Sequence, residues 1–323
     1  MKLLTSGKLN PYPIKIDTSA SLQRVIDGLK EQPYEAKVPT SGWGEVSLLE
    51  KDEAEALYKR NCTGRPTWHP QSFGAPLGLG RLFFDRFSSI LSQQIPVEQE
   101  DELGAAATHV LDAIDVLFME TGQSLTALIN THTSHEISSR VMPKLRSVLE
   151  AIDPDHSIVD PHPEFSIDPD LFLWLLSQQE TDGWLLPGLR LLEIRTVQGI
   201  DGIAQKARVL DSASLERLEL QAMISNVHET FGPMKVALRD DDVRLEADIY
   251  LASDGSFSVH VGRSHYFDDI ESRPQLGVHL VHDVARSTVP RLRRAYGEDQ
   301  AWRKGGRTAF RDQIRTRLRQ RLA

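Results

Sequence analysis

Between Lys235 and Arg263, apolar and polar residues alternate with the two-residue period of β-strands. The apolar residues fall into three groups, which are Val236 and Leu238, then Val243, Leu245, Ala247, Ile249 and Leu251, then Phe257, Val259 and Val261. Strands that are apolar on one face and polar on the other are typical of an antiparallel sheet with one face in water. We therefore predict a three-stranded antiparallel meander.

The register of this meander follows from the side-chain period, because opposed residues of an antiparallel pair lie on the same face. Pairing the apolar faces of the second and third strands places Leu251 opposite Phe257 and Asp248 opposite His260. The same rule requires a loop of even length in the first hairpin, most simply Asp241-Asp242.

The chain before the meander shows mainly the 3.6-residue period of helices. The clearest case begins in the acidic cluster at residues 98–102, which suits the positive end of a helix dipole, and continues through Leu103, Ala107, Val110, Ile114 and Leu117. Asp168 is a good N-cap residue, and Pro169 is favoured as the first residue of a helix. Further helices are predicted at Ser21–Lys30, Arg81–Ser92, Val141–Ile152 and Ser214–Val227, and a strand is predicted at Leu189–Val197.

These patterns predict an α+β fold with a mostly helical N-terminal half, an antiparallel β-meander in the C-terminal half and a closing amphipathic, arginine-rich helix. Four parts are predicted along the chain. They are an irregular N-terminal region with short helices at 1–95, a helical block at 96–185, a sheet with one inserted helix at 186–283, and a basic helical segment at 284–323.

The closing helix is predicted at Thr308–Leu322, where an apolar ladder and a basic ladder run side by side. The apolar ladder comprises Phe310, Ile314, Leu318 and Leu322 at four-residue steps, and the basic ladder comprises Arg311, Arg315 and Arg319. The apolar face of such a helix can dock on a protein surface while its guanidinium groups face phosphates or carboxylates.

Charge is divided unevenly along the chain, whose formal net charge is -9. Residues 284–323 contain twelve Arg or Lys against three Asp or Glu, so the rest of the chain is strongly acidic. A basic segment on an acidic chain predicts a nucleic-acid contact, a protein contact or packing on the acidic body. The candidate contact residues are Arg291, Arg293, Arg294, Arg311, Arg315 and Arg319.

Asp248 and His260 are the most specific catalytic candidates, since a carboxylate beside an imidazole fixes its tautomer and raises its basicity. The same two side chains also form an ordinary opposite-charge pair on a wet sheet face. Glu193, with Arg195 two residues later, imitates the acidic and basic spacing of metal-dependent nucleases. A nuclease or another nucleic-acid-processing enzyme that uses these residues is therefore the alternative hypothesis.

No cofactor or metal site is predicted. Cys62 is the only cysteine, so neither an intramolecular disulfide nor a zinc site of several cysteines can form within one chain. His132 and His135 have a spacing that suits one helical face, but no third ligand is evident near them.

No apolar run reaches the roughly 18 residues of a membrane span, and the first residues lack the apolar stretch of a secretory signal, so we expect a cytoplasmic protein. The excess of arginine over lysine is typical of GC-rich bacterial genomes. The main hypothesis is a non-enzymatic binding or assembly subunit, an accessory component of a bacterial multi-protein system. We expect it to contact a protein partner, a second copy of itself or a nucleic acid through its basic C-terminal helix.

Overall fold

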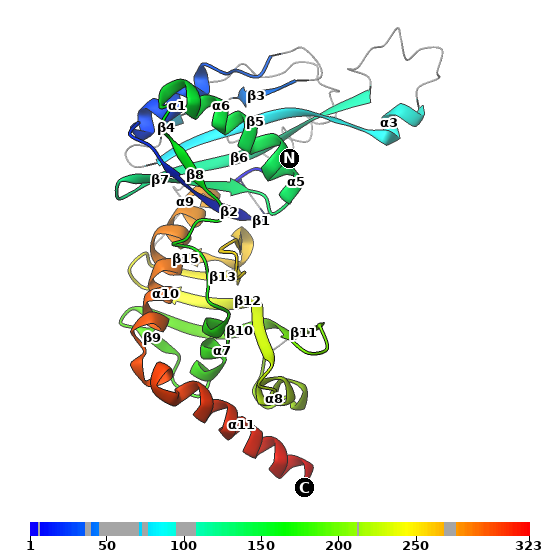
Figure 1. Cartoon of the computed structure of the whole chain (residues 1–323), viewed down its shortest axis with the longest axis vertical. Coiled ribbons are helices and arrows are strands. Elements are labelled where there is room, and N and C mark those ends of the chain that lie inside the picture. Colours follow the sequence, from blue (N-terminus) through cyan, green and yellow to red (C-terminus); the bar gives the residue numbers. More distant parts are fainter. Residues whose placement is uncertain are drawn as a thin grey trace. The chain divides into compact units, whose positions relative to one another are not determined.

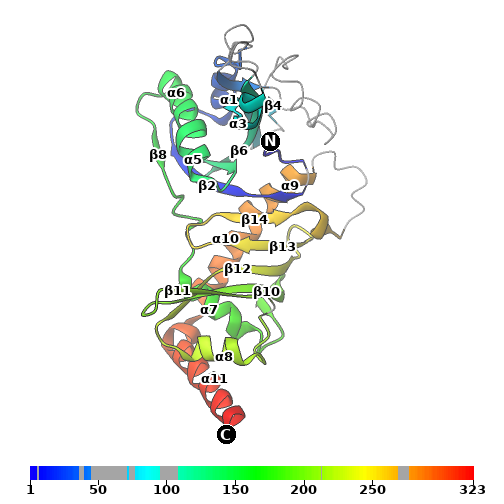
Figure 2. The same ribbon diagram turned by 90° about the vertical axis from the view of Figure 1, so that its right-hand side faces the viewer.

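The computed structural model describes residues 1–5, 7–35, 40–44, 71–72, 77–94, 108–211, 213–267 and 276–323. Contacts divide the chain into two compact units. Unit 1 comprises Met1–Pro163 with Gln275–Val278, and unit 2 comprises Glu164–Pro274 with His279–Ala323. Figures 1 and 2 show the elements of both units in two perpendicular views.

Unit 1 is built on an antiparallel sheet with the strand order β3-β5-β6-β7-β2-β8, and β4 pairs with β5. A short strand, β1 (Lys8–Leu9), precedes β2 in the sequence. The strands of the sheet are β2 (Pro11–Asp17), β3 (Ser41–Gly44), β4 (Gln71–Ser72), β5 (Leu77–Phe87), β6 (His109–Thr121), β7 (Ser124–Asn130) and β8 (Ser157–Val159).

Helices cover one face of this sheet (Figure 1). They are α1 (Leu22–Lys30) and a continuous helix that consists of α5 (Ser134–Glu136), a π-helical turn (Ile137–Val141) and α6 (Met142–Ile152). The core packs the apolar residues of α1 and α6 against alternate residues of the strands. The predicted helices at Ser21–Lys30 and Val141–Ile152 are confirmed, and Ser21 caps α1 by accepting a hydrogen bond from the backbone N–H of Arg24.

The prediction of a mostly helical N-terminal half is wrong, because unit 1 is mainly an antiparallel sheet. Val110, Ile114 and Leu117 lie in strand β6, while residues 98–107 lie outside the described residues. Every side chain from Val110 to Met119 is buried. A strand with two buried faces is apolar at nearly every position, so it also satisfies the helical period.

The helix predicted at Arg81–Ser92 fails for the same reason. Strand β5 is buried from Leu77 to Asp85 and extends to Phe87, so the first part of the predicted segment is strand. Only α3 (Ser89–Gln94) is helical there.

Unit 2 contains a second antiparallel sheet, in which β14, β13, β12, β10 and β11 are neighbours in that order. Strand β9 pairs with β10, and β15 pairs with β13. The strands are β9 (Trp184–Leu186), β10 (Leu189–Asp201), β11 (Lys206–Asp211), β12 (Glu229–Asp240), β13 (Leu245–Leu251), β14 (Phe257–His260) and β15 (His265–Tyr266).

The apolar face of this sheet is buried, with α7 packed against β12. The α-helices after residue 164 are, in chain order, α7 (Pro169–Gln178), α8 (Leu218–Ser225), α9 (Leu276–Asp283), α10 (Val289–Glu298) and α11 (Arg307–Leu322). The first three residues of α9 belong to unit 1. We call the opposite, polar face of the sheet the outer face. It carries Arg190, Lys235, Arg239, Glu246 and Asp248, because these residues share one face by the strand registers.

The predicted meander and its register are confirmed. Leu251 pairs with Phe257 and Ile249 with Val259, as parity required. The first hairpin has an even loop, but the loop contains four residues rather than two, since Asp240 pairs with Leu245. Arg244 in this loop has a φ of 54°, so the chain turns before β13 and Val243 stays outside the strand.

The predicted helix starts and ends of unit 2 are largely confirmed. Asp168 caps α7 by accepting a hydrogen bond from the Asp170 N–H, and Pro169 is the first helical residue. Helix α8 is shorter than the predicted Ser214–Val227, and α11 matches the predicted closing helix to within one residue. No described helix combines the length and the apolar character that crossing a bilayer requires.

Candidate functional site

The predicted catalytic residue Asp248 lies on the outer face with its side chain only 2% exposed. Its Oδ2 atom accepts a hydrogen bond from Arg195 Nη1 at 2.6 Å and lies 3.3 Å from Lys235 Nζ. His260 is the last residue of β14. Within the described part of the chain, no hydrogen bond joins Asp248 to His260, whose Nδ1 atom has no partner there. The carboxylate therefore balances two cations and does not orient the imidazole.

Glu193 joins the same network from β10. Its Oε2 atom accepts a hydrogen bond from Arg195 Nε at 3.1 Å, so one guanidinium bridges Glu193 and Asp248. Glu193 and Asp248 both lie opposite Ala237 of β12, on either side of that strand. Among the described residues, no group of three or more His, Cys, Asp or Glu side chains is placed to hold a metal ion. The structure thus brings these two predicted residues together around an arginine, not around a cluster of ligands.

A different set of outer-face residues stands out because it places like charges together. Arg190 of β10 and Arg239 of β12 are directly opposed in the register, and both are exposed. Directly opposed like charges destabilise an antiparallel pair. Because an anion between two opposed guanidinium groups relieves their repulsion, the pair is a candidate site for an anion.

Each of these two arginines is supported by an exposed aromatic ring. The guanidinium carbon of Arg190 lies 5.6 Å from the centroid of the Trp184 ring, and that of Arg239 lies 4.4 Å from the Phe267 ring. Trp184 is 46% exposed and Phe267 is 36% exposed, so parts of both rings are open to a ligand. We call these four residues the Arg–aromatic row. Cation–π contact holds each guanidinium in place without neutralising its charge.

Among the described residues, one nitrogen of each guanidinium in the row has a hydrogen-bond partner. Arg190 Nε donates to the Asp182 carbonyl oxygen at 3.0 Å, and Arg239 Nε donates to Asp241 Oδ1 at 2.8 Å. Within the described part of the chain, the terminal nitrogens of both arginines have no partner. Glu246 lies opposite Arg239 on β13, but its carboxylate is placed 3.7 Å from His265 Nε2. Four terminal amino groups are therefore available to an external acceptor.

A pocket of about 500 Å³ lies beside Arg190. It runs along residues 190–194 of β10. Strand β9 pairs with β10 at residues 189–190 and β11 pairs with it from residue 196 onward, so among the described residues the edge of β10 between them is left without a neighbouring strand on that side. Gln178 and Gln179, at the end of α7, form part of its wall together with Asp182, Glu193 and Ser214. The lining is mostly polar and offers both hydrogen-bond donors and acceptors.

The predicted contact residues Arg311 and Arg315 are bound to the protein's own backbone. Arg311 is only 5% exposed, and its terminal nitrogens donate to the carbonyl oxygens of Ile224 at 2.7 Å, Glu229 at 3.0 Å and Asn226. Arg315 Nη2 donates to the Ser225 carbonyl oxygen at 3.1 Å. Three of these carbonyls belong to the end of α8 or the residue after it, where the helix dipole is negative. Burial lowers the pKa of Arg311.

The other predicted arginines occupy varied surroundings. Arg291 is paired with Asp240, which is 1% exposed, and burial lowers the pKa of the half-buried Arg293. Arg294 lies 3.8 Å from a glutamate one turn later, so its contact is weak. Arg319 is exposed and has no polar partner within the described part of the chain.

The apolar ladder of α11 is buried only at its first two steps. Phe310 is 5% exposed and Ile314 is fully buried, whereas Leu322 is 71% exposed. The helix packs against α8 and α7 at its start, and its last turn extends beyond them (Figures 1 and 2). The ladder thus serves first to dock α11 on unit 2.

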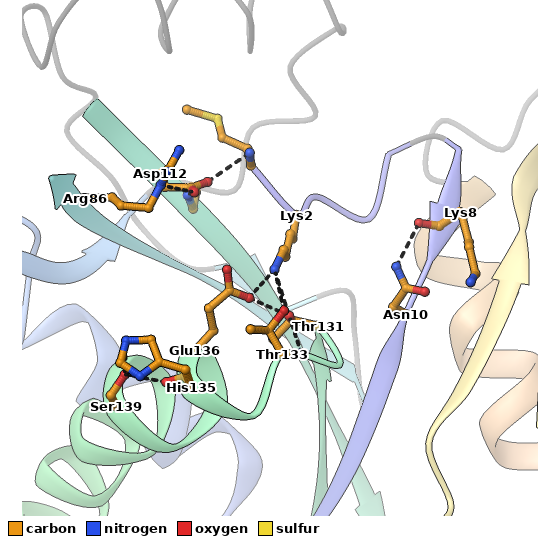
Figure 3. A network of polar contacts seen from close by, with 12 residues as sticks. Lys2, Lys8, Asn10, Arg86, Asp112, Thr131, Thr133, His135, Glu136 and Ser139 are labelled. Atoms are coloured by element: carbon orange, nitrogen blue, oxygen red, sulfur yellow. Dashed lines mark hydrogen bonds and ion pairs between the residues drawn. The ribbon is translucent and has the colours of Figure 1, made fainter. Parts of the chain in front are cut away.

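Unit 1 contains a separate polar network, which Figure 3 shows around Lys2. Lys2 Nζ donates to Thr131 Oγ1 at 3.0 Å and to Thr133 Oγ1 at 3.2 Å, and it forms an ion pair with Glu136. His135 contacts Ser139 one turn later on its own helix. These contacts join the first residues of the chain to the start of α5, so we assign the network a structural role.

Sequence reasoning did not identify the Arg–aromatic row. The alternation of the meander places Arg239 on the polar face, and this placement is the one part of the row that can be predicted from the sequence. The opposition of Arg190 and Arg239 depends on the pairing of β10 with β12, two strands separated by β11 and α8 in the chain. A scan against protein-family models and a search of curated proteins gave no match to this chain.

Proposed function

We propose that the chain is a non-enzymatic binding component that holds single-stranded nucleic acid on the outer face of the unit 2 sheet. The observation that carries the proposal is the opposed pair of Arg190 and Arg239, each in contact with an exposed aromatic ring and each with terminal nitrogens that have no partner among the described residues. A phosphate between the two guanidinium groups relieves their repulsion and accepts bidentate hydrogen bonds.

The rings beside the arginines favour a nucleic acid over an acidic peptide. Trp184 and Phe267 offer exposed π-surface next to the proposed phosphate site, and base stacking on such rings contributes about 1–3 kcal/mol per base. Bases stack on any aromatic face, so the row predicts binding with little sequence preference. A paired duplex keeps its bases inside, which is why we propose a single strand.

The basic C-terminal helix is a weaker candidate for this contact. Arg311 and Arg315 are held by carbonyls at the end of α8, and Arg317 and Arg321 are paired with Glu180 and Glu216. The hypothesis that α11 binds a protein partner or a second copy stays a prediction, and the exposed Leu322 is what supports it. The nuclease alternative also stays a prediction, with less support because cations already neutralise Asp248.

The test is fluorescence anisotropy with a labelled oligothymidylate at low salt. We expect Arg190→Ala with Arg239→Ala to weaken binding about tenfold or more, because two charge-assisted contacts are lost. Arg319→Ala is the matched control, since it removes an exposed arginine of α11 that has no polar partner in the described part of the chain.

The salt dependence separates the two surfaces. One phosphate held between Arg190 and Arg239 on a single strand predicts a slope of log affinity against log salt of about -0.7, whereas six phosphates neutralised by the predicted basic segment predict about -4. A wild-type protein that ignores the oligonucleotide at low salt would refute the proposal. So would equal losses in the double variant and the Arg319→Ala control.

A further inference from the structure

One residue that lines the pocket beside Arg190, Gln179, has a buried donor atom without a partner in the described part of the chain. Gln179 is the C-cap residue of α7, and its Nε2 atom is buried with no hydrogen-bond partner in the described part of the chain. A buried N–H group without an acceptor is unfavourable, and most buried polar atoms in proteins are paired. Gln179 is one of the residues that line a pocket of about 500 Å³, which is within the size range of small-molecule sites.

The rest of the lining supplies complementary groups. Asp182 and Glu193 contribute carboxylates that accept hydrogen bonds, and Ser214 contributes a hydroxyl. Leu192, which is 39% exposed, adds an apolar surface. A flat ligand that carries donors and acceptors along one edge and is apolar on its faces matches this set.

Arg190 belongs both to the pocket lining and to the Arg–aromatic row. The ligand of the pocket is therefore adjacent to a group that binds phosphate. We infer that the pocket receives one nucleobase of the strand whose phosphate Arg190 holds, an inference that rests on the proposed function. Gln179 Nε2 donates to a ring nitrogen or carbonyl of the base, and a carboxylate of Glu193 or Asp182 accepts from its amino or ring N–H group.

Strand β10 is irregular at this point, which opens the space for a base. Its pairing with β12 shifts register between Leu191 and Glu193, and β11 pairs with β10 only from Thr196 onward. The bulge turns Leu192 and Glu193 toward solvent, and both are exposed. The pocket is thus a feature of the strand that also carries Arg190.

The experiment compares ribose 5-phosphate with the four ribonucleoside 5′-monophosphates by isothermal titration calorimetry on the full chain. Ribose 5-phosphate reports the phosphate contact alone, and the nucleotides add a base. We expect at least one nucleotide to bind about tenfold more tightly than ribose 5-phosphate, which corresponds to about 1.4 kcal/mol.

Two variants test the pocket. Gln179→Leu removes the amide at nearly constant volume, and Ser214→Trp fills the space, so both should reduce the affinity ratio to near one while ribose 5-phosphate binds as before. Gln23→Leu, on an exposed face of α1 in unit 1, is the matched control and should keep the ratio. Circular dichroism shows whether each variant is folded. Gln179→Leu removes a hydrogen-bonding group and Ser214→Trp blocks the space, so the two variants test the pocket independently.

The outcomes distinguish the two proposals. A wild-type ratio near one, or an unchanged ratio in both folded pocket variants, overturns the base site and leaves the phosphate site standing. If Arg190→Ala with Arg239→Ala binds ribose 5-phosphate and oligothymidylate as well as wild type does, the proposed function itself fails.

Discussion

Replacement of Arg311 by alanine tests whether the arginine ladder of α11 stabilises the protein or faces a partner. The side chain is only 5% exposed, and it makes hydrogen bonds to three backbone carbonyls, of Ile224, Asn226 and Glu229. Each hydrogen bond from a charged donor contributes about 1.5–3 kcal/mol net. The ring of Phe231 lies 6.0 Å from the guanidinium carbon and adds a weak cation–π contact.

These terms do not add in full, because water can enter the space and hydrate part of the freed carbonyls. We therefore expect Arg311→Ala to lower the free energy of unfolding by about 3–5 kcal/mol, near the value for removing one partner of a buried charged contact. Arg311→Lys should recover only part of this loss, because an ammonium cannot span the three carbonyls as the guanidinium fork does.

The assay is urea denaturation followed by circular dichroism, with Arg319→Ala as the matched control on the same helix. The control should change the free energy of unfolding by less than about 0.5 kcal/mol, as surface substitutions do. A loss of under about 1 kcal/mol in Arg311→Ala would refute the structural role of this arginine. A loss of oligonucleotide affinity in a variant that stays folded would instead assign α11 to the contact surface.

Three further substitutions have defined outcomes. Burial raises the pKa of Glu229, so the folded state binds this proton more tightly and stability falls as the pH rises through the raised folded value. Glu229→Gln should accordingly raise Tm at neutral pH but not at acidic pH, and equal shifts at both pH values would contradict this. Asp115→Asn leaves the fully buried Arg81 without its bidentate partner and should destabilise unit 1 by about 3–5 kcal/mol in urea denaturation. Asp248→Asn should cost about 1–2 kcal/mol, because Arg195 is partly exposed and can be hydrated, and a nuclease assay that loses activity with it would revive the enzymatic alternative.

The sequence predicted structure best where local rules decide it. Parity alone placed Leu251 opposite Phe257, because a one-residue slip would move every apolar side chain of the strand into water. Capping chemistry located the start of α7, since Asp168 accepts a hydrogen bond from the orphan N–H of Asp170, and the apolar face of Ser21–Lys30 located α1. These features depend on neighbours close in sequence.

The use of hydrophobic period to predict secondary structure failed where both faces of a strand are buried, because the alternation of apolar and polar residues is then lost. Strand β6 has two buried faces, so Val110, Ile114 and Leu117 are embedded in a nearly continuous apolar run that only Asp112 and Asp115 interrupt. Such a run fits a helix and a strand equally well, and only its pairing with β5 and β7 decides between them. The hydrophobic period of a single segment therefore cannot show that the segment is a strand of a sheet buried on both faces.

The sequence did not predict the Arg–aromatic row, because the two arginines of the row become neighbours only through strand pairing. The local charge pattern instead indicated the arginines of the C-terminal segment. Arginines close together in sequence are conspicuous, but Arg291, Arg311 and Arg315 are bound by the chain's own carboxylates and carbonyls. Arg190 and Arg239 are 49 residues apart and each is unremarkable in its own segment. Only the pairing of β10 with β12 places the two arginines opposite each other.

The proposed function requires a chain of net charge -9 to hold a polyanion, and this distinction accounts for how it could do so. Exposed charges separated by more than about 8 Å are largely screened at physiological ionic strength, so affinity depends on the local field and not on the total charge. Arginines whose terminal nitrogens are bound contribute little to that field, whereas Arg190 and Arg239 are opposed and their terminal nitrogens have no partner among the described residues, although Asp241 offsets part of the charge of Arg239. Under the proposed function, the acidic remainder of the chain would repel a nucleic acid strand elsewhere on the surface and so would favour its binding on the outer face of unit 2.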